Sequence, residues 1–189
     1  LSRTGQVGIT RVGQTATLMP DGSVLIAGGG LFSLLAERYE PATGIFRELG
    51  NAKLQTDRFG HTATLLGNGN ILLTGGSRRI PGGLYTPVAS TEIYDAETES
   101  FSRSGTLGSN RFRHTATLLN DGTVLIVGGA NSDAEIYDTN SETSRSVGPN
   151  EGRIRVGATA TKLPDGRVLF VGGVDSEFVL LQNGLIFNP

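Results

Sequence analysis

The chain has 189 residues, a formal net charge of −2 and no cysteine. At about 100–200 residues per domain, this length predicts a single domain. The lack of cysteine excludes disulfides, thiol nucleophiles and cysteine-based metal sites. The near-neutral charge supplies no global field for nucleic acid, and no apolar run approaches the roughly 20 residues of a membrane-spanning helix.

The first predicted element is a β-hairpin over residues 15–29, TATLMPDGSVLIAGG. Its centre is Asp21-Gly22, a dipeptide that tolerates the positive φ of a two-residue hairpin turn. A third short run ends at Tyr39, and a fourth begins at Phe46, seven residues later. Short apolar runs bounded by Gly, Asp and Asn predict an all-β unit of four antiparallel strands.

The same unit recurs three more times along the chain. Its hairpins read TATLLGNGNILLTGG at 62–76, TATLLNDGTVLIVGG at 115–129 and TATKLPDGRVLFVGG at 159–173. Third strands are expected at 92–94, 135–137 and, more loosely, 185–187. The fourth strand of the second copy begins at Phe101, and Ser144 breaks the aromatic pattern in the third copy. Four short strands in every ~45–50 residues are typical of a propeller blade.

These residues resemble the kelch repeat, by the Gly-Gly that ends strand two, the tyrosine of strand three and the aromatic residue that opens strand four. The resemblance covers essentially the whole chain and implies a β-propeller with strand one innermost. We expect four blades, at residues 11–50, 58–105, 111–148 and 155–189. Similar kelch repeats occur in bacterial secreted proteins and in galactose-oxidase-like enzymes, so the resemblance favours an extracellular or periplasmic location.

Residues 1–5, LSRTG, mirror residues 101–105, FSRSG, which open a fourth strand. The fourth copy reaches only its third strand, around Ile186. We therefore expect residues 1–5 to pair with that strand, complete blade four and close the ring, because closure removes open sheet edges. The alternatives are a fragment of a longer array and two chains that share an eight-bladed ring, so the chain is expected to be a monomer or a strand-exchanged dimer.

One arginine stands four residues before each inner strand: Arg11, Arg58, Arg111 and Arg155. The kelch resemblance places these arginines around the mouth of the central channel, and implies a ligand contact, because kelch adaptors bind acidic peptides through arginines at this place. A mouth lined by one sign of charge favours anionic partners, and guanidinium groups suit carboxylates. The expected partner is an acidic peptide or an acidic glycan. The alternative is a structural brace, in which each arginine pairs with a repeated acid on strand three: Glu37, Glu92 and Glu135, replaced by Leu185 in the fourth copy.

The insertion at residues 77–90, SRRIPGGLYTPVAS, is expected to be a long loop on the arginine-bearing face. Binding residues concentrate on loops of rigid scaffolds, so Arg78, Arg79 and Tyr85 join the candidate site. The alternative for this loop is a packed surface flap or a lattice contact.

His61 and His114 precede the inner strands of copies two and three and are candidate ligand contacts. Two histidines without a third ligand make a poor metal site, so no metal or other cofactor is expected; the alternative is a hydrogen-bonded histidine between blades. Galactose-oxidase-like chemistry, by resemblance, needs copper and a cysteine-crosslinked tyrosine, and the chain has no cysteine. No nucleophile–base–acid set is visible, so no catalytic residue is named.

The function expected from these residues is that of a kelch-type binding module for protein or glycan, acting through the arginine-lined mouth. One alternative is a sugar-processing enzyme of the kelch mutarotase type, in which Arg, His and Glu side chains shuttle protons. Another is a structural or assembly element. Nucleic acid is not an expected partner, because the sequence has no basic stripe with aromatic stacking platforms.

Overall fold

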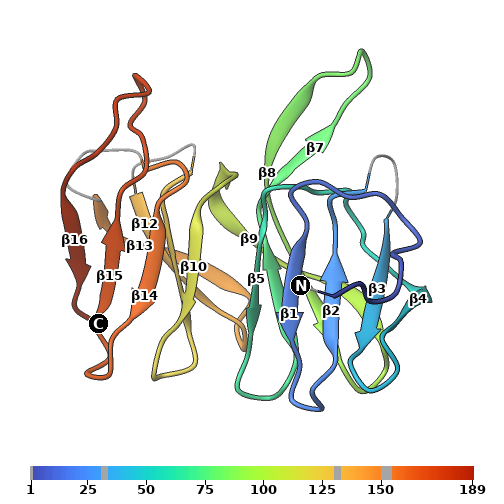
Figure 1. The fold of residues 1–189 in the computed structure, drawn as a ribbon. Helices are drawn as coiled ribbons and strands as arrows, with labels where there is room; N and C mark the ends of the chain where they lie inside the picture. Colours follow the sequence, from blue (N-terminus) through green and yellow to red (C-terminus); the bar gives the residue numbers. More distant parts are fainter. Residues whose placement is uncertain (1, 31–33, 130–132, 150–154) are drawn as a thin grey trace.

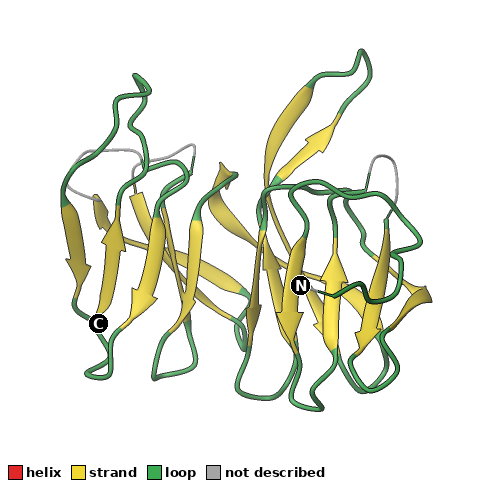
Figure 2. Ribbon diagram, viewed as in Figure 1, coloured by secondary structure: helices red, strands yellow, loops and turns green. Residues whose placement is uncertain are grey.

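The computed structural model describes residues 2–30, 34–129, 133–149 and 155–189 (Figure 1). Within these residues there are sixteen β-strands and no helix (Figure 2), which confirms the all-β prediction. The described part of the chain accordingly has no helix of the length and apolarity that crossing a membrane requires. The strands form four antiparallel sheets, one for each sequence repeat.

Each sheet begins with the two strands of the repeated hairpin. The first sheet contains β1 (Thr15–Leu18), β2 (Val24–Ala27), β3 (Leu35–Glu40) and β4 (Ile45–Lys53). The second contains β5 (Thr62–Leu65), β6 (Ile71–Thr74), β7 (Ser77–Arg79), β8 (Tyr85–Asp95) and β9 (Ser100–Arg111). The third contains β10 (Thr115–Leu118), β11 (Val124–Val127), β12 (Asp133–Asp138) and β13 (Thr143–Pro149), and the fourth β14 (Thr159–Lys162), β15 (Val168–Val171) and β16 (Gly184–Phe187).

The four repeated hairpins share one register, in which Leu18 of β1 lies opposite Val24 of β2. The turn differs from the two-residue type expected from Asp-Gly. The Met19 amide donates to the Ser23 carbonyl, and only Gly22 has a positive φ, of 85°. This is a three-residue loop that ends in a left-handed glycine, the second common hairpin connection.

The first strand of each sheet is called its innermost strand below. These strands, β1, β5, β10 and β14, lie side by side, in that order. Figure 1 shows the sheets as an open row, with β14–β16 at one end and the first sheet at the other. The hairpin turns gather at the lower end of the row in this view, while the segments leading into the innermost strands gather at the upper end.

The N-terminal residues correct one expectation about the end of this row. The Gly5 amide donates to the Gly44 carbonyl at 2.9 Å, and Thr4 Oγ1 is hydrogen-bonded to the Tyr39 hydroxyl at 2.8 Å. Residues 2–5 therefore lie on the first sheet rather than on β16, and the fourth sheet has three described strands. The prediction that residues 1–5 pair with the strand around Ile186 is wrong for the part that is described; Leu1 lies outside it.

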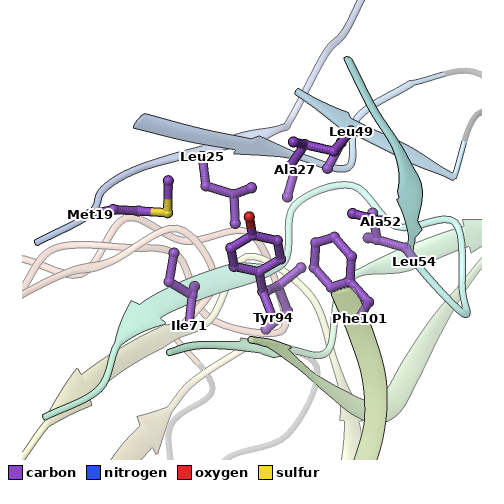
Figure 3. Packing of buried hydrophobic residues seen from close by; sticks show 11 residues of the cluster. Met19, Leu25, Ala27, Leu49, Ala52, Leu54, Ile71, Tyr94 and Phe101 are labelled. Carbon is purple, nitrogen blue, oxygen red and sulfur yellow. The ribbon is translucent and has the colours of Figure 1, made fainter. Parts of the chain in front are cut away.

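The hydrophobic core lies between neighbouring sheets. In Figure 3, Met19, Leu25 and Ala27 of the first sheet pack against Ile71 and other side chains of the second. All members of this cluster are at most 7% exposed. Burial of a large aliphatic side chain contributes about 1.5–3 kcal/mol, and each of the three buried clusters among the described residues joins two neighbouring sheets.

The insertion in the second repeat is a β-hairpin rather than the expected long loop. β7 pairs with the first residues of β8, with Arg79 opposite Tyr85. Gly82 and Gly83, with φ of 87° and 80°, make the tight turn between them. This hairpin, called the β7–β8 arm below, projects beyond the four sheets (Figure 1).

Candidate functional site

The four predicted arginines occupy equivalent places, each before the innermost strand of its sheet. Their side chains are buried: 2% exposed for Arg11, and 0% for Arg58 and Arg111. Arg155 is 2% exposed as a residue. The expected open ring of guanidinium groups is therefore not what the structure contains, because these groups face protein on every side.

Each guanidinium is hydrogen-bonded to the backbone at the end of the second strand of its own sheet. Its Nη1 donates to the carbonyl of the first glycine of the Gly-Gly pair. The distances are 2.7 Å for Arg11–Gly28, Arg58–Gly75 and Arg111–Gly128, and 2.8 Å for Arg155–Gly172. The repeated Gly-Gly and the repeated arginine are thus two parts of one structural motif.

Strand three supplies the counter-charge in three of the four sheets. The ion pairs are Arg11–Glu37 at 2.9 Å, Arg58–Glu92 at 2.5 Å and Arg111–Glu135 at 2.6 Å. In the fourth sheet, Asn183 Oδ1 accepts from Arg155 Nη2 at 2.7 Å instead. These are the contacts of the structural-brace alternative, with Asn183 in the place of the missing acid.

The same glutamates also hold the preceding segment of chain. Glu37 accepts from the Gly8 amide at 2.6 Å, and Glu135 accepts from the Gly108 amide at the same distance. Burial opposes ionisation of Glu135, but hydrogen bonds from Ser144 and Gly108, together with Arg111, hold its pKa below the ordinary value. A carboxylate that joins a guanidinium to a neighbouring backbone is a structural link between repeats.

The two histidines lie between sheets. His61 Nε2 is hydrogen-bonded to Thr15 Oγ1 of the first sheet at 3.1 Å, and His114 Nε2 to Thr74 Oγ1 of the second at 2.8 Å. Burial lowers the pKa of each imidazole to about 3, with a further contribution from the nearby arginines. Both histidines are therefore neutral at pH 7 and have the contacts of the structural alternative.

The described residues contain no cluster of three or more His, Asp or Glu side chains placed to hold a metal ion. The chemistry of a candidate site therefore has to come from another part of the surface.

A cavity of about 240 Å³ lies at the base of the β7–β8 arm. Its walls come from the segment before β1, the end of β2, the segment before β5 and the arm, and the lining residues include Val12, Phe59, Arg79 and Tyr85. The Phe59 and Tyr85 rings meet edge to face, with centroids 4.9 Å apart. The cavity therefore has an aromatic wall beside a guanidinium group.

The base of the arm is held by backbone pairing. The Phe59 amide donates to the Ser77 carbonyl at 3.0 Å, and the reverse bond measures 2.9 Å. Asp57 Oδ2 accepts from the Arg79 amide at 3.3 Å. A second hollow of about 520 Å³ shares Asp57 and Arg79 with the first and continues under the turn of the arm.

One exposed arginine, Arg113, has an unusual backbone conformation close in space to Gly60. Gly13, Gly60 and Gly157 precede inner strands with positive φ, and Arg113 occupies the equivalent place with φ of 53°. Its amide donates to the Gly60 carbonyl, directly after Phe59. The left-handed conformation is unfavourable for residues other than glycine, and non-glycine residues held in it cluster at binding and active sites.

The structure thus separates the predicted site residues into two groups. The four arginines and two histidines are buried between and within sheets, and of these only Arg58 also contributes to the cavity wall. Arg79 and Tyr85 line the cavity as well, and Arg78 is exposed on the arm. Phe59 and Val12 were not identified from the sequence, because they approach Tyr85 only through the tertiary fold. The sequence matches no known protein-family model, and a search of curated proteins finds no significant match.

Proposed function

We propose that this chain is a kelch-type β-propeller array that acts as a binding module, with its ligand site in the cavity beneath the β7–β8 arm. The observation that carries the proposal is this cavity, where the Phe59–Tyr85 pair and Arg79 converge on a rigid sheet scaffold. Four successive antiparallel sheets with neighbouring innermost strands support the propeller assignment.

The chemistry of the site favours an acidic partner. Arg78 and Arg79 lie on the arm, Arg113 is held through its amide to Gly60, the residue after Phe59, and Asp57 is the acidic side chain that lines both hollows. Guanidinium groups bind carboxylates with planar, charge-assisted hydrogen bonds. Tyr85 is 51% exposed and offers an aromatic surface beside those charges.

The size of the cavity limits what enters it. Drug-sized ligands need about 300–1,000 Å³, so about 240 Å³ suits one side chain of a peptide or one sugar unit. The rest of an acidic peptide or an acidic glycan would lie along the arm and the continuing hollow. The site therefore recognises an end group or a single residue of a longer partner.

The test compares binding of acidic and neutral glycans, and of Glu/Asp-rich peptides, to wild type and to Tyr85→Ala and Arg113→Ala. We expect each substitution to weaken acidic-ligand binding by about tenfold or more, as for aromatic and arginine anchors in general, and added salt to weaken it further. Arg167→Ala, an exposed arginine near the hairpin turn of the fourth repeat, is the matched control. Unchanged binding of the acidic ligands by both site variants would contradict the proposal.

A further inference from the structure

The two ends of the row expose faces that are buried everywhere inside it. At each internal joint, the leading sheet presents three side chains to the sheet that follows. These are Met19, Leu25 and Ala27; Leu66, Leu72 and Thr74; and Leu119, Leu125 and Val127, all at most 7% exposed. The fourth sheet carries Leu163, Leu169 and Val171 at the same places, but Leu163 and Leu169 are half-buried and Val171 is 51% exposed.

The first sheet shows the complementary half of such a joint. At each internal joint, two side chains of the second strand of the following sheet pack against the preceding sheet. These pairs are at most 3% exposed: Ile71 and Leu73, Val124 and Ile126, Val168 and Phe170. Val24 and Ile26 hold these places on β2 and are only half-buried. Each end therefore carries apolar residues of the type that the other end would bury.

The backbone repeats this complementarity. At the internal joints, the amide of the second glycine of the Gly-Gly pair donates to the backbone carbonyl of the repeated arginine of the following sheet. The first glycine of the pair lies against the same carbonyl oxygen. The donor bonds are Gly29–Arg58, Gly76–Arg111 and Gly129–Arg155, at 2.7–2.8 Å. At Gly172 the φ is again positive, at 71°, but no described atom stands within 4 Å of where a Cβ would lie. The matching arginine carbonyl is that of Arg11, four residues before β1; the sheet of β1 is at the opposite end of the row from β14–β16 (Figure 1).

The strand edges are complementary as well. The outer edge of β16 has no partner strand in the described part of the chain. Residues 2–5 carry the sequence of an outermost strand and contact the first sheet as residues 102–105 contact the third: Thr4 reaches Tyr39 as Ser104 reaches Tyr137. In the second sheet, Ile93 pairs with Ser102, so the same register places Ile186 opposite Ser2.

We propose that a second copy of this chain docks head to tail, with the fourth sheet of one copy against the first sheet of the next. β16 then pairs with residues 2–5 of the second copy, and the Gly173 amide meets its Arg11 carbonyl. The two halves of the joint lie at opposite ends of the row (Figure 1), so a second copy presents the complementary face to each end. Such a contact is heterologous: it forms a ring when the rotation between copies closes, and an open filament when it does not.

The first test uses the absence of natural cysteine. Two single variants, Ser2→Cys and Ile186→Cys, are mixed under mild oxidation, and a second pair, Arg3→Cys and Leu185→Cys, tests the adjacent register position. We expect a covalent dimer from at least one mixture and much less from any variant alone. Cross-strand neighbours lie within disulfide reach.

The outcomes separate the possible occupants. A chain that carries both cysteines and forms only an internal disulfide would show closure within one copy and overturn the proposal. Absence of covalent dimer from both mixtures, with a monomer by analytical ultracentrifugation, would also overturn it. Formation of mixed dimers supports it.

The second test leaves the fold intact. Val171→Lys places a charge on the exposed end face, and we expect it to weaken self-association by at least tenfold in sedimentation. Leu84→Lys, at an apolar residue on the arm that is 66% exposed, is the control and should associate as wild type does. Equal association by wild type and Val171→Lys would contradict the proposed joint. The ligand cavity lies inside the row, so failure of this test leaves the proposed function standing.

Discussion

Three tyrosines at the same third-strand position have different surroundings for their hydroxyl groups. The Tyr137 hydroxyl is hydrogen-bonded to Ser104 and accepts from the Gly105 amide, while the Tyr94 hydroxyl has no partner among the described residues. Leu49 stands where Thr4 and Ser104 stand in the equivalent segments. Figure 3 shows the Tyr94 hydroxyl pointing toward Leu25, inside the apolar cluster, and burial raises its pKa to about 12.

This difference predicts opposite results for one substitution. Tyr137→Phe should lower the free energy of unfolding by about 1–2 kcal/mol, because it leaves buried partners without their hydrogen bonds. Tyr94→Phe should be neutral or raise it by up to about 1 kcal/mol, because it removes a buried polar group that has no partner. Urea denaturation measures both, and equal losses in the two variants would contradict the assignment.

The buried ion pairs predict a second contrast between single residues. Glu135→Leu copies the residue of the fourth repeat, but no asparagine replaces the carboxylate here, so Arg111 keeps a buried charge without its acid. We expect a loss of about 3–5 kcal/mol, as for other broken buried pairs. Asp165→Ala removes an exposed partner of Arg167 and one hydrogen bond of the hairpin turn, so it should lower the melting temperature much less than Glu135→Leu does. A loss below about 1 kcal/mol for Glu135→Leu would show that the brace is dispensable.

Among the elements, the repeated Gly-Gly pair ends strand two and makes the joint to the next sheet. A Cβ at Gly128 would stand 2.1 Å from the Arg155 carbonyl oxygen, whereas a Cβ at Gly172 meets nothing within 4 Å. Both residues have positive φ, of 83° and 71°. Glycine is therefore required at residue 128 by both packing and backbone conformation, and at residue 172 by backbone conformation alone.

The matched substitutions Gly128→Ala and Gly172→Ala separate these requirements. We expect Gly172→Ala to cost about 1 kcal/mol in the monomer, the penalty of a left-handed alanine. Gly128→Ala should cost several kcal/mol more, because the third and fourth sheets must separate. Thermal unfolding monitored by circular dichroism would show this, and similar melting temperatures would indicate that the joint is looser than the contacts imply.

Acid sensitivity is a property of the whole molecule, because both histidines lie at joints between sheets. Their folded pKa of about 3 is below the ordinary value of 6.5, so the unfolded chain binds more protons between those limits. Stability therefore falls as the pH drops from about 6.5 toward 3, by about 1 kcal/mol per pH unit for each histidine. Carboxylates with lowered pKa, such as Asp21 and Asp121, add their loss only below about pH 4.

The measurement is the free energy of unfolding at pH 7, 6, 5 and 4. His61→Gln and His114→Gln remove the titrating groups, and the first repeat already carries Gln14 at this position. We expect each substitution to flatten the slope between pH 6.5 and 4, and the double variant to remove most of it. An unchanged slope in the double variant would assign the acid sensitivity to other groups.

The sequence by itself determined the elements that depend on neighbours within about fifteen residues. Short apolar runs around Asp-Gly or Asn-Gly specify the four hairpins in their correct places, and the repeat period specifies one sheet for each copy. The two-residue turn expected from Asp-Gly is wrong, because Asp-Gly also suits a three-residue loop that ends in a left-handed glycine. The loop expected at residues 77–90 is also wrong, because two strands in this segment pair with each other across Gly82-Gly83.

Only the tertiary structure decided the features that depend on contacts between repeats. A repeated arginine faces either a channel or a carboxylate, and the choice follows from how closely the sheets pack; here all four guanidinium groups are buried. The cavity joins Val12, Phe59 and Tyr85, which come from three separate segments of the chain. The position of residues 2–5 on the first sheet likewise follows from long-range packing, because their sequence suits the outer edge of any of the four sheets.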